Sequence, residues 1–216
     1  MEKTARGFFV TFEGLDGLGK STQLQRLAHH LGELGLDPVC SREPTDGPWG
    51  REARRVAREG RSGLTHEEEL DLYLRDRAEH LEMLVGPALA AGRIVLVDRY
   101  VHSSIAYQGA LGLDPDRVRA LNFPRFPVPD LTLLFEAPVE VALERIRAGR
   151  PDGANVGYET EDFLRRVAGH YARMQDACLV RVDASGSPDE VAARVWYVVR
   201  RRGIQDLSAP SQTRER

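Results

Sequence analysis

The chain has 216 residues and a formal net charge of −3, with 42% hydrophobic and 29% charged residues. This composition indicates a soluble globular protein with one substantial core, and the slight negative charge argues against a nucleic acid as the main partner. No apolar run approaches the roughly eighteen residues of a membrane span, and the charged start, Met1-Glu2-Lys3, lacks a signal-peptide core. Cys40 and Cys178 lie in apolar, strand-like surroundings, which favours two reduced core thiols in a cytoplasmic protein; a disulfide is the alternative.

A strand, a glycine-rich loop and a helix are predicted at the start of the chain. Residues 8–12 are apolar and β-branched, as in a buried strand, and apolar residues recur at helical spacing from Leu24 to Leu31. Residues 14–21 between them match G-x-x-x-x-G-K-[ST] at every fixed position. The backbone N–H groups of such a loop, with the helix N-terminus behind them, bind phosphate.

The loop therefore predicts a nucleoside triphosphate site. Lys20 is expected to reach the β- and γ-phosphates, and the Ser21 hydroxyl to ligate Mg²⁺. The alternative, a glycine-rich loop with a chance lysine, does not account for the flanking strand and helix. The residues expected at the nucleotide are Gly14, Leu15, Asp16, Gly17, Leu18, Gly19, Lys20, Ser21 and Thr22.

Strands and helices alternate along the rest of the chain. Further strands are predicted at 38–41, 93–98, 131–135 and 179–182, and helices at 66–91, 114–122, 138–148, 160–177 and 188–201. Thr65 is a candidate cap for the longest helix, which Pro87 should kink or break near its end. This alternation predicts a parallel α/β sheet with helices packed against it. Residues 1–204 are expected to form a single domain, followed by a polar, disordered tail at 205–216.

Asp98 is a candidate metal ligand because it ends the predicted strand 93–98. Open α/β sheets bind ligands at the carboxyl ends of their strands, and an acid paired with a phosphate loop commonly holds Mg²⁺. A capping or salt-bridged aspartate is the alternative.

Three blocks of the sequence resemble the thymidylate kinase family. They are F-E-G-L-D-G-L-G-K-S-T at 12–22, R-E-P at 42–44, and D-R-Y followed by S-S-I-A-Y-Q-G within 98–109. Residues 129–131 and 141–145 also match the family, so the resemblance runs from about residue 7 to about residue 200. Many NTPases share the phosphate loop, so the second and third blocks are the specific ones.

The resemblance implies a three-layer P-loop kinase fold, with a central parallel sheet flanked by helices and a short lid at about 146–159. It also implies transfer of the γ-phosphate of ATP to dTMP with Mg²⁺, in a homodimer. The alternatives are a related kinase that acts on another deoxynucleotide or nucleoside, and a nucleotide-dependent switch or binding protein.

The same resemblance assigns residues to the base of the acceptor. Tyr73, where the family more often has phenylalanine, would stack on thymine, and Arg77 would contact the base. Read without the resemblance, Tyr73 is a core aromatic and Arg77 a solvated charge. Pro44 would pack near the base, and Ser104 would offer its hydroxyl to the pyrimidine.

Other matched residues are expected at the sugar and phosphate. Arg99 would hold the acceptor phosphate, and Tyr107 would crowd the sugar where bulk excludes a 2′-hydroxyl. Asp16 would lie between the acceptor sugar and the metal-bound phosphates. Arg42 and Gln108 complete the expected substrate-binding set.

The catalytic cation is expected from the lid, because Gly17 stands where some relatives carry a basic residue in the phosphate loop. Arg150 is the first candidate and Arg147 the second. The residues expected to act in catalysis are Lys20, Asp16, Arg99, Arg150 and Arg147.

Overall fold

The computed structural model describes residues 7–60, 63–149 and 160–204. Its strands are β1 (Phe8–Gly14), β2 (Val39–Arg42), β3 (Ile94–Asp98), β4 (Leu131–Glu136) and β5 (Leu179–Asp183). They form one sheet in the order β2-β3-β1-β4-β5, and every neighbouring pair is parallel. The predicted parallel α/β fold is confirmed, with β1 at its centre.

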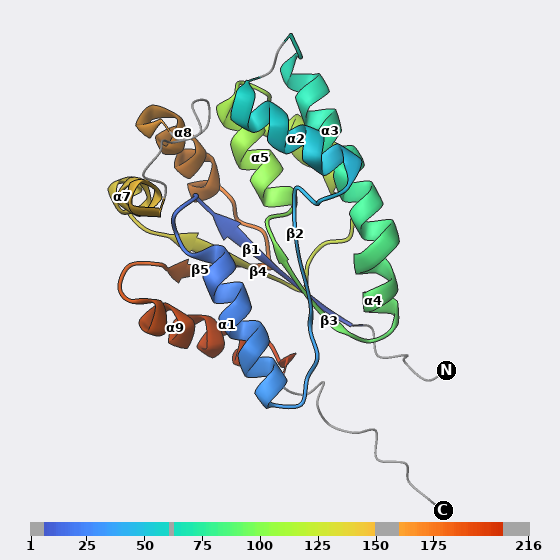
Figure 1. The fold of residues 1–216 in the computed structure, drawn as a ribbon, viewed down its shortest axis with the longest axis vertical. Coiled ribbons are helices and arrows are strands. Elements are labelled where there is room, and N and C mark those ends of the chain that lie inside the picture. Colours follow the sequence, from blue (N-terminus) through green and yellow to red (C-terminus); the bar gives the residue numbers. More distant parts are fainter. Residues whose placement is uncertain (1–6, 61–62, 150–159, 205–216) are drawn as a thin grey trace, which may run out of the picture.

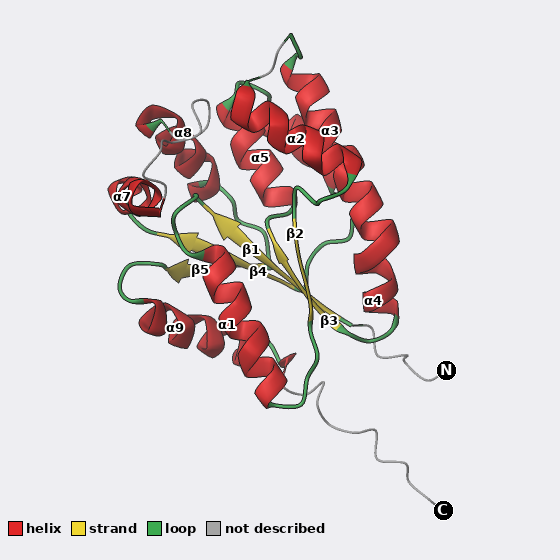
Figure 2. Ribbon diagram, in the orientation of Figure 1, coloured by secondary structure: helices red, strands yellow, loops and turns green. Residues whose placement is uncertain are grey.

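Helices cover both faces of this sheet (Figures 1 and 2). Figure 1 shows α1 and α9 together on one side, and α3, α4 and α5 on the other. None of the helices within residues 7–60, 63–149 and 160–204 has the length and apolar character that a membrane crossing requires. The helices are α1 (Lys20–Glu33), α2 (Pro48–Glu59), α3 (His66–His80), the π-helix η1 (Leu81–Val85), α4 (Gly86–Ala90), α5 (Val101–Ala110), α6 (Pro115–Asn122), α7 (Val139–Gly149), α8 (Glu161–Ala172) and α9 (Pro188–Arg201).

The predicted long helix 66–91 is interrupted, as Pro87 led us to expect. Thr65 begins it with a capping box shared with Glu68. The break starts before the proline: residues 81–85 form a π-helical turn in which the N–H of Gly86 donates to the carbonyl of Leu81. Proline has no N–H for the carbonyl four residues back and its ring clashes with that carbonyl, so the preceding turn widens.

Two helices were not predicted from the sequence. Helix α5 is buried over most of its surface, so it lacks the one-sided apolar pattern by which helices are recognised. Helix α2 is rich in arginine and buries only small or β-branched residues, namely Gly50, Ala53 and Val56. The sequence-based expectation for Cys40 was also wrong, because this thiol is exposed on the edge strand β2, whereas Cys178 is buried; both are free.

A buried ion pair attaches α5 to the rest of the fold. His102, on α5, is fully buried and lies 3.2 Å from Asp176. Arg119, on α6, contacts the same carboxylate at 2.5 and 3.0 Å. Burial lowers the pKa of His102, but the hydrogen bond with Asp176 and the nearby Cys178 and Glu13 outweigh it and raise that pKa to about 9. The histidine is therefore a buried cation at neutral pH.

We predict that this pair makes stability depend on pH. Since the pKa of His102 is about 9 in the folded protein and 6.5 ordinarily, its contribution is complete below about pH 6.5 and is lost as the pH rises through about 9. Denaturant unfolding from pH 6 to 10 measures the free energy. The destabilisation caused by His102→Gln should shrink over this range, whereas His29→Gln, at a side chain that is 80% exposed, should have little effect at any pH. A destabilisation by His102→Gln that does not change with pH would contradict the prediction.

Candidate functional site

The phosphate loop connects β1 to α1 and depends on its glycines. Gly17 and Gly19 have φ angles of 79° and 80°, in the left-handed region that L-residues disfavour. A Cβ atom on Gly17 would lie 2.5 Å from the carbonyl oxygen of Ala142, and one on Gly14 would lie 2.4 Å from that of Phe135. Larger residues would therefore push the loop away from α7 and β4.

A cleft opens over this loop. Its lining comes from the loop, the start of α1 and the end of α7. Leu15 and Leu18, which were expected at the nucleotide, point their side chains into the core with 3% and 2% exposure, so only their backbone can serve the cleft. The cleft is lined by Asp16, Gly17, Gly19, Lys20, Ser21, Thr22, Arg145, Ile146 and Gly149.

Lys20 is held inside this cleft. Its side chain is largely buried, and Nζ donates to the carbonyl oxygen of Leu15 at 2.8 Å. Burial and the charge of Arg99 lower the pKa of Lys20 to about 8. The ammonium group is thus available for a phosphate near neutral pH, and alkali removes its charge.

Ser21 and Asp98 meet at the side of the same loop. The Ser21 hydroxyl donates to Oδ2 of Asp98. The other carboxylate oxygen, Oδ1, is buried and has no hydrogen-bond partner among the described residues. A hydroxyl beside a carboxylate oxygen that lacks a partner fits a hard divalent cation such as Mg²⁺, which binds oxygen ligands.

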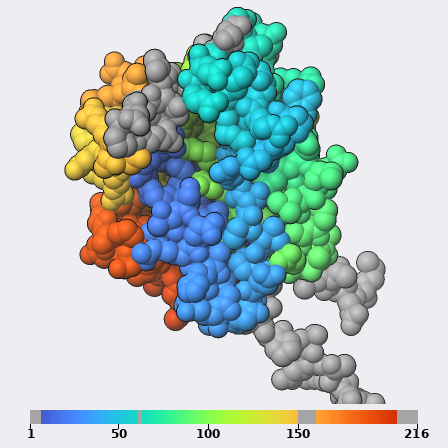
Figure 3. All heavy atoms as spheres, viewed as in Figure 1, coloured from blue at the N-terminus to red at the C-terminus, as the bar shows by residue number. Residues whose placement is uncertain are grey.

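A second cleft, with a cavity of about 210 Å³, lies between the β2–α2 loop and helices α2, α3 and α5. In Figure 3 a recess is visible between the blue atoms of the phosphate loop and the cyan atoms of α2, with green atoms of α5 at its floor. Of the substrate-binding residues expected from the resemblance, the cavity brings together Pro44, Tyr73, Arg77, Arg99, Ser104, Tyr107 and Gln108.

Arg42 lies elsewhere. Its side chain is 62% exposed and pairs with Asp46, and it lines a neighbouring cleft that includes Ser21 and Asp98. Conversely, Arg54 and Ala57 of α2 line the second cleft, although neither was predicted. No sequence signal pointed to them, because the small buried side of α2 left the helix itself unrecognised.

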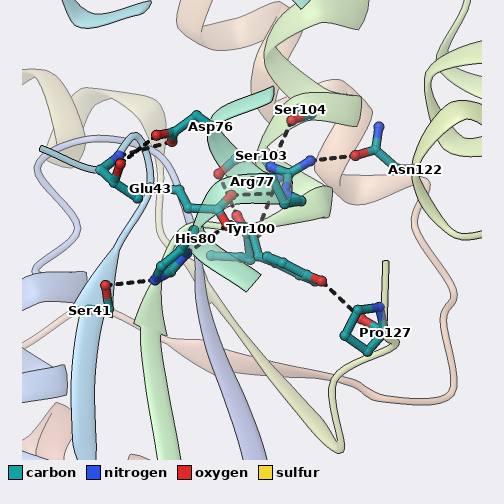
Figure 4. A network of polar contacts seen from close by, with 12 residues as sticks. Ser41, Glu43, Asp76, Arg77, His80, Tyr100, Ser103, Ser104, Asn122 and Pro127 are labelled. Atoms are coloured by element: carbon teal, nitrogen blue, oxygen red, sulfur yellow. Dashed lines mark hydrogen bonds and ion pairs between the residues drawn. The ribbon is translucent and has the colours of Figure 1, made fainter. Parts of the chain in front are cut away.

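Arg77 is the best-held cation of the second cleft. It is 2% exposed, so reading it from the sequence as a solvated charge is wrong. Its Nε donates to Glu43 at 2.8 Å, Nη2 donates to Ser104 at 3.0 Å, and Nη1 donates to Asn122 (Figure 4). Glu43 also accepts from His80, at 3.1 Å. Acceptors from the β2–α2 loop, α5 and α6 thus fix the guanidinium in one plane.

The two clefts meet at Asp16, which lines both. Arg99 reaches it from the end of β3, with Nη2 donating to Asp16 Oδ1 at 2.7 Å. The same nitrogen donates to the Tyr107 hydroxyl at 3.1 Å. Burial raises the pKa of Tyr107, so its hydroxyl stays neutral. Lys20 lies 4.0 Å from the same carboxylate, so Asp16 stands between the cation of one cleft and that of the other.

The predicted lid, 146–159, is described only in part. Residues 146–149 belong to α7, where Arg147 is exposed. Arg145, on the same helix, donates to the carbonyl oxygens of Ala184 and Gly186, both at 3.1 Å, and so holds the β5–α9 loop. Arg150 with the rest of the lid, and the tail at 205–216, lie outside the described residues.

We predict that ATP affinity falls at alkaline pH. The Lys20 cation is present below its pKa of about 8 and is lost above it, which removes a charge-assisted contact to phosphate. Calorimetric titration of ATP from pH 6.5 to 9.5 measures this loss. Lys20→Met should bind ATP weakly at pH 7 and approach the wild type above pH 9. Parallel pH curves for the two proteins would contradict the role.

Comparison with known proteins agrees with this geometry. The family model described as thymidylate kinase matches residues 12–195. A thymidylate kinase of Akkermansia muciniphila is 47% identical over 191 residues, which is 88% of this chain and 90% of that protein. One from Xanthomonas campestris pv. campestris is 45% identical, with 92% and 86% covered, and one from Desulfotalea psychrophila is 42% identical, with 86% and 90% covered. The chain belongs to the thymidylate kinase family.

Proposed function

We propose that this protein transfers the γ-phosphoryl group of ATP to dTMP, giving ADP and dTDP. The observation that carries the proposal is the meeting of two clefts at Asp16, with Lys20 in one and Arg99 in the other. Phosphoryl transfer requires alignment of donor and acceptor and cations around the transferred oxygens, but little covalent chemistry from the protein. Family membership supports the same reaction.

In this proposal the second cleft binds the acceptor base. An arginine has only donors, so Arg77 selects a base that presents a carbonyl oxygen, as thymine does. Ser104, which accepts from Arg77, lies beside it. Tyr73 lines the cleft, and burial raises the pKa of its hydroxyl, which therefore stays neutral. Pro44 and Gln108 complete the walls around the base.

Arg99 then holds the acceptor phosphate, and Tyr107 lies beside the sugar. The Tyr107 ring lines this cleft 4.8 Å from the Arg99 guanidinium, and by the family resemblance it would exclude a ribose 2′-hydroxyl. Arg42, from the adjoining cleft, would reach the phosphates rather than the base. Deoxyribonucleotides are therefore the expected acceptors.

Ser21 and Asp98 are the proposed ligands of Mg²⁺, and the support is the Asp98 oxygen that has no partner among the described residues. The metal neutralises charge on the β- and γ-phosphate oxygens when it is bound. Lys20 and Asp16 arrange the groups around the transferred phosphoryl group. A homodimer belongs to the same proposal and rests on the family resemblance, whereas a cytoplasmic location rests on the two cysteines, both of which are free.

The test is an acceptor panel of dTMP, dUMP, UMP, CMP, AMP and GMP with ATP, monitored by ADP release. We expect dTMP to have the highest kcat/KM, UMP to be poor because of Tyr107, and omission of Mg²⁺ to abolish turnover. UMP or AMP used as efficiently as dTMP would contradict the assignment. ADP release that does not depend on any acceptor would instead favour a nucleotide-hydrolysing switch.

Arg147 and Arg150 are the proposed sources of the additional cation at the transferred phosphoryl group. An arginine in this role contributes on the order of 10³ to 10⁵ in rate, so the double change Arg147→Ala/Arg150→Ala should lower kcat strongly while the protein stays folded. Arg165→Ala is the matched control, because this exposed arginine of α8 pairs with Glu140 and Glu161 away from the clefts. A double variant with kcat within a few-fold of the wild type would assign the cation elsewhere.

A further inference from the structure

Glu13 is a buried carboxylate at the end of β1 for which the proposed reaction gives no direct role. Its exposure is 0%, and it lies between the strand core and the phosphate loop. A carboxylate in such a place costs free energy unless its oxygens accept hydrogen bonds. Both oxygens of Glu13 do so, and every donor comes from another element.

One oxygen, Oε1, accepts from the backbone at the start of α5. The N–H of Tyr100 donates to it at 2.8 Å and the N–H of Ser103 at 3.1 Å. These are among the first amides of the helix, which have no carbonyl partner inside it. Tyr100, the N-cap residue, gives the helix no side-chain cap in the part of the chain that the structure describes. The carboxylate of β1 therefore caps α5.

The residue just before this cap is Arg99, whose backbone is strained. Its φ angle is 72°, and among the described residues it is the one non-glycine with a positive φ. Side chains disfavour this region, so the surroundings must hold the backbone there. The N–H of Arg99 donates to the carbonyl of Phe12 at 2.9 Å, and the next N–H along the chain donates to Glu13. Phe12 and Glu13 thus accept hydrogen bonds from two successive N–H groups and hold the backbone of this turn in place.

The other oxygen, Oε2, sets the direction of a hydrogen bond to the Arg99 side chain. Ser103 Oγ donates to it at 2.5 Å, and the Tyr171 hydroxyl of α8 donates at 2.9 Å. Because a carboxylate only accepts hydrogen bonds, the Ser103 hydroxyl donates to it, and the lone pairs of Ser103 Oγ are left to accept from Arg99 or from the Tyr171 hydroxyl, which lies 3.0 Å away. Arg99 Nη1 donates to that same Oγ at 3.0 Å. The guanidinium is therefore held by a serine that Glu13 has oriented.

We propose that Glu13 is a positioning residue for the acceptor phosphate: it fixes both the strained backbone and the guanidinium orientation of Arg99. The inference rests on the proposed function, in which Arg99 holds that phosphate. Glu13 touches no substrate and acts through Arg99 and Ser103.

Glu13→Gln tests the proposal because glutamine has the shape of glutamate but carries a donor NH₂ group in place of the acceptor Oε2. The amide nitrogen would donate to Ser103 Oγ, which then has to accept from both the amide and Arg99, while its own proton turns away from residue 13. We expect the KM of the acceptor to rise about tenfold, the equivalent of about 1.4 kcal/mol, with the KM of ATP within about twofold of the wild type. Thr11→Val is the matched control: it breaks a buried hydrogen bond between β1 and β4 and should change stability without changing either KM.

If Glu13→Gln does not fold, two further variants test the proposal. Ser103→Ala preserves the backbone cap and should raise the acceptor KM, whereas Tyr171→Phe preserves the Ser103 link and should raise it less. Acceptor KM values within twofold of the wild type for Glu13→Gln, or for Ser103→Ala if Glu13→Gln does not fold, would overturn the proposal. Equal changes in the two substrates' KM values would do the same. The acceptor used is whichever monophosphate the wild type phosphorylates best, so failure of dTMP contradicts the proposed function alone.

Discussion

The register of β1 against β3 is the constraint on which both clefts depend. Phe12 pairs with Asp98, so the phosphate loop that follows β1 and the D-R-Y turn that follows β3 begin side by side. This pairing brings Ser21 to Asp98 and Asp16 to Arg99. A slip by one residue would turn alternate side chains to the other face and separate both pairs at once. The apolar cores on both faces of the sheet therefore also determine the geometry of the site.

Buried charges around the second cleft are each held by several hydrogen bonds. Arg77 is surrounded by Glu43, Ser104 and Asn122, and Glu13 accepts four hydrogen bonds. In a low-dielectric interior each such bond is strong, and leaving one partner unpaired is costly. The guanidinium groups are thus oriented before substrate arrives, so little reorganisation is needed on binding.

The local sequence pattern predicted well those parts of the protein whose structure depends on residues that are neighbours in the chain. The phosphate loop needs glycines, a lysine and a serine at fixed spacing, and the apolar strands needed no partner to be recognised. The sequence pattern failed to predict α5, because this helix is buried on most sides and does not alternate between apolar and polar faces. It also failed to predict α2, because the residues that this helix buries are small or β-branched. It also failed for Cys40, because sequence does not show that β2 is the edge strand.

The sequence by itself determined the parallel α/β fold, the phosphate loop, the family resemblance and most residues of the second cleft. Only the tertiary structure decided that Arg77 is buried rather than solvated, that Asn122 and Glu43 hold it, and that Arg54 joins the cleft while Arg42 faces the adjoining one. It also decided the place of Glu13, which meets Ser103 ninety positions away in the chain and Tyr171 farther still. The physical reason is that sheet register and helix packing bring together the two partners of such a hydrogen bond, which lie in distant segments of the chain. Neither segment therefore shows a sequence pattern that would reveal the bond.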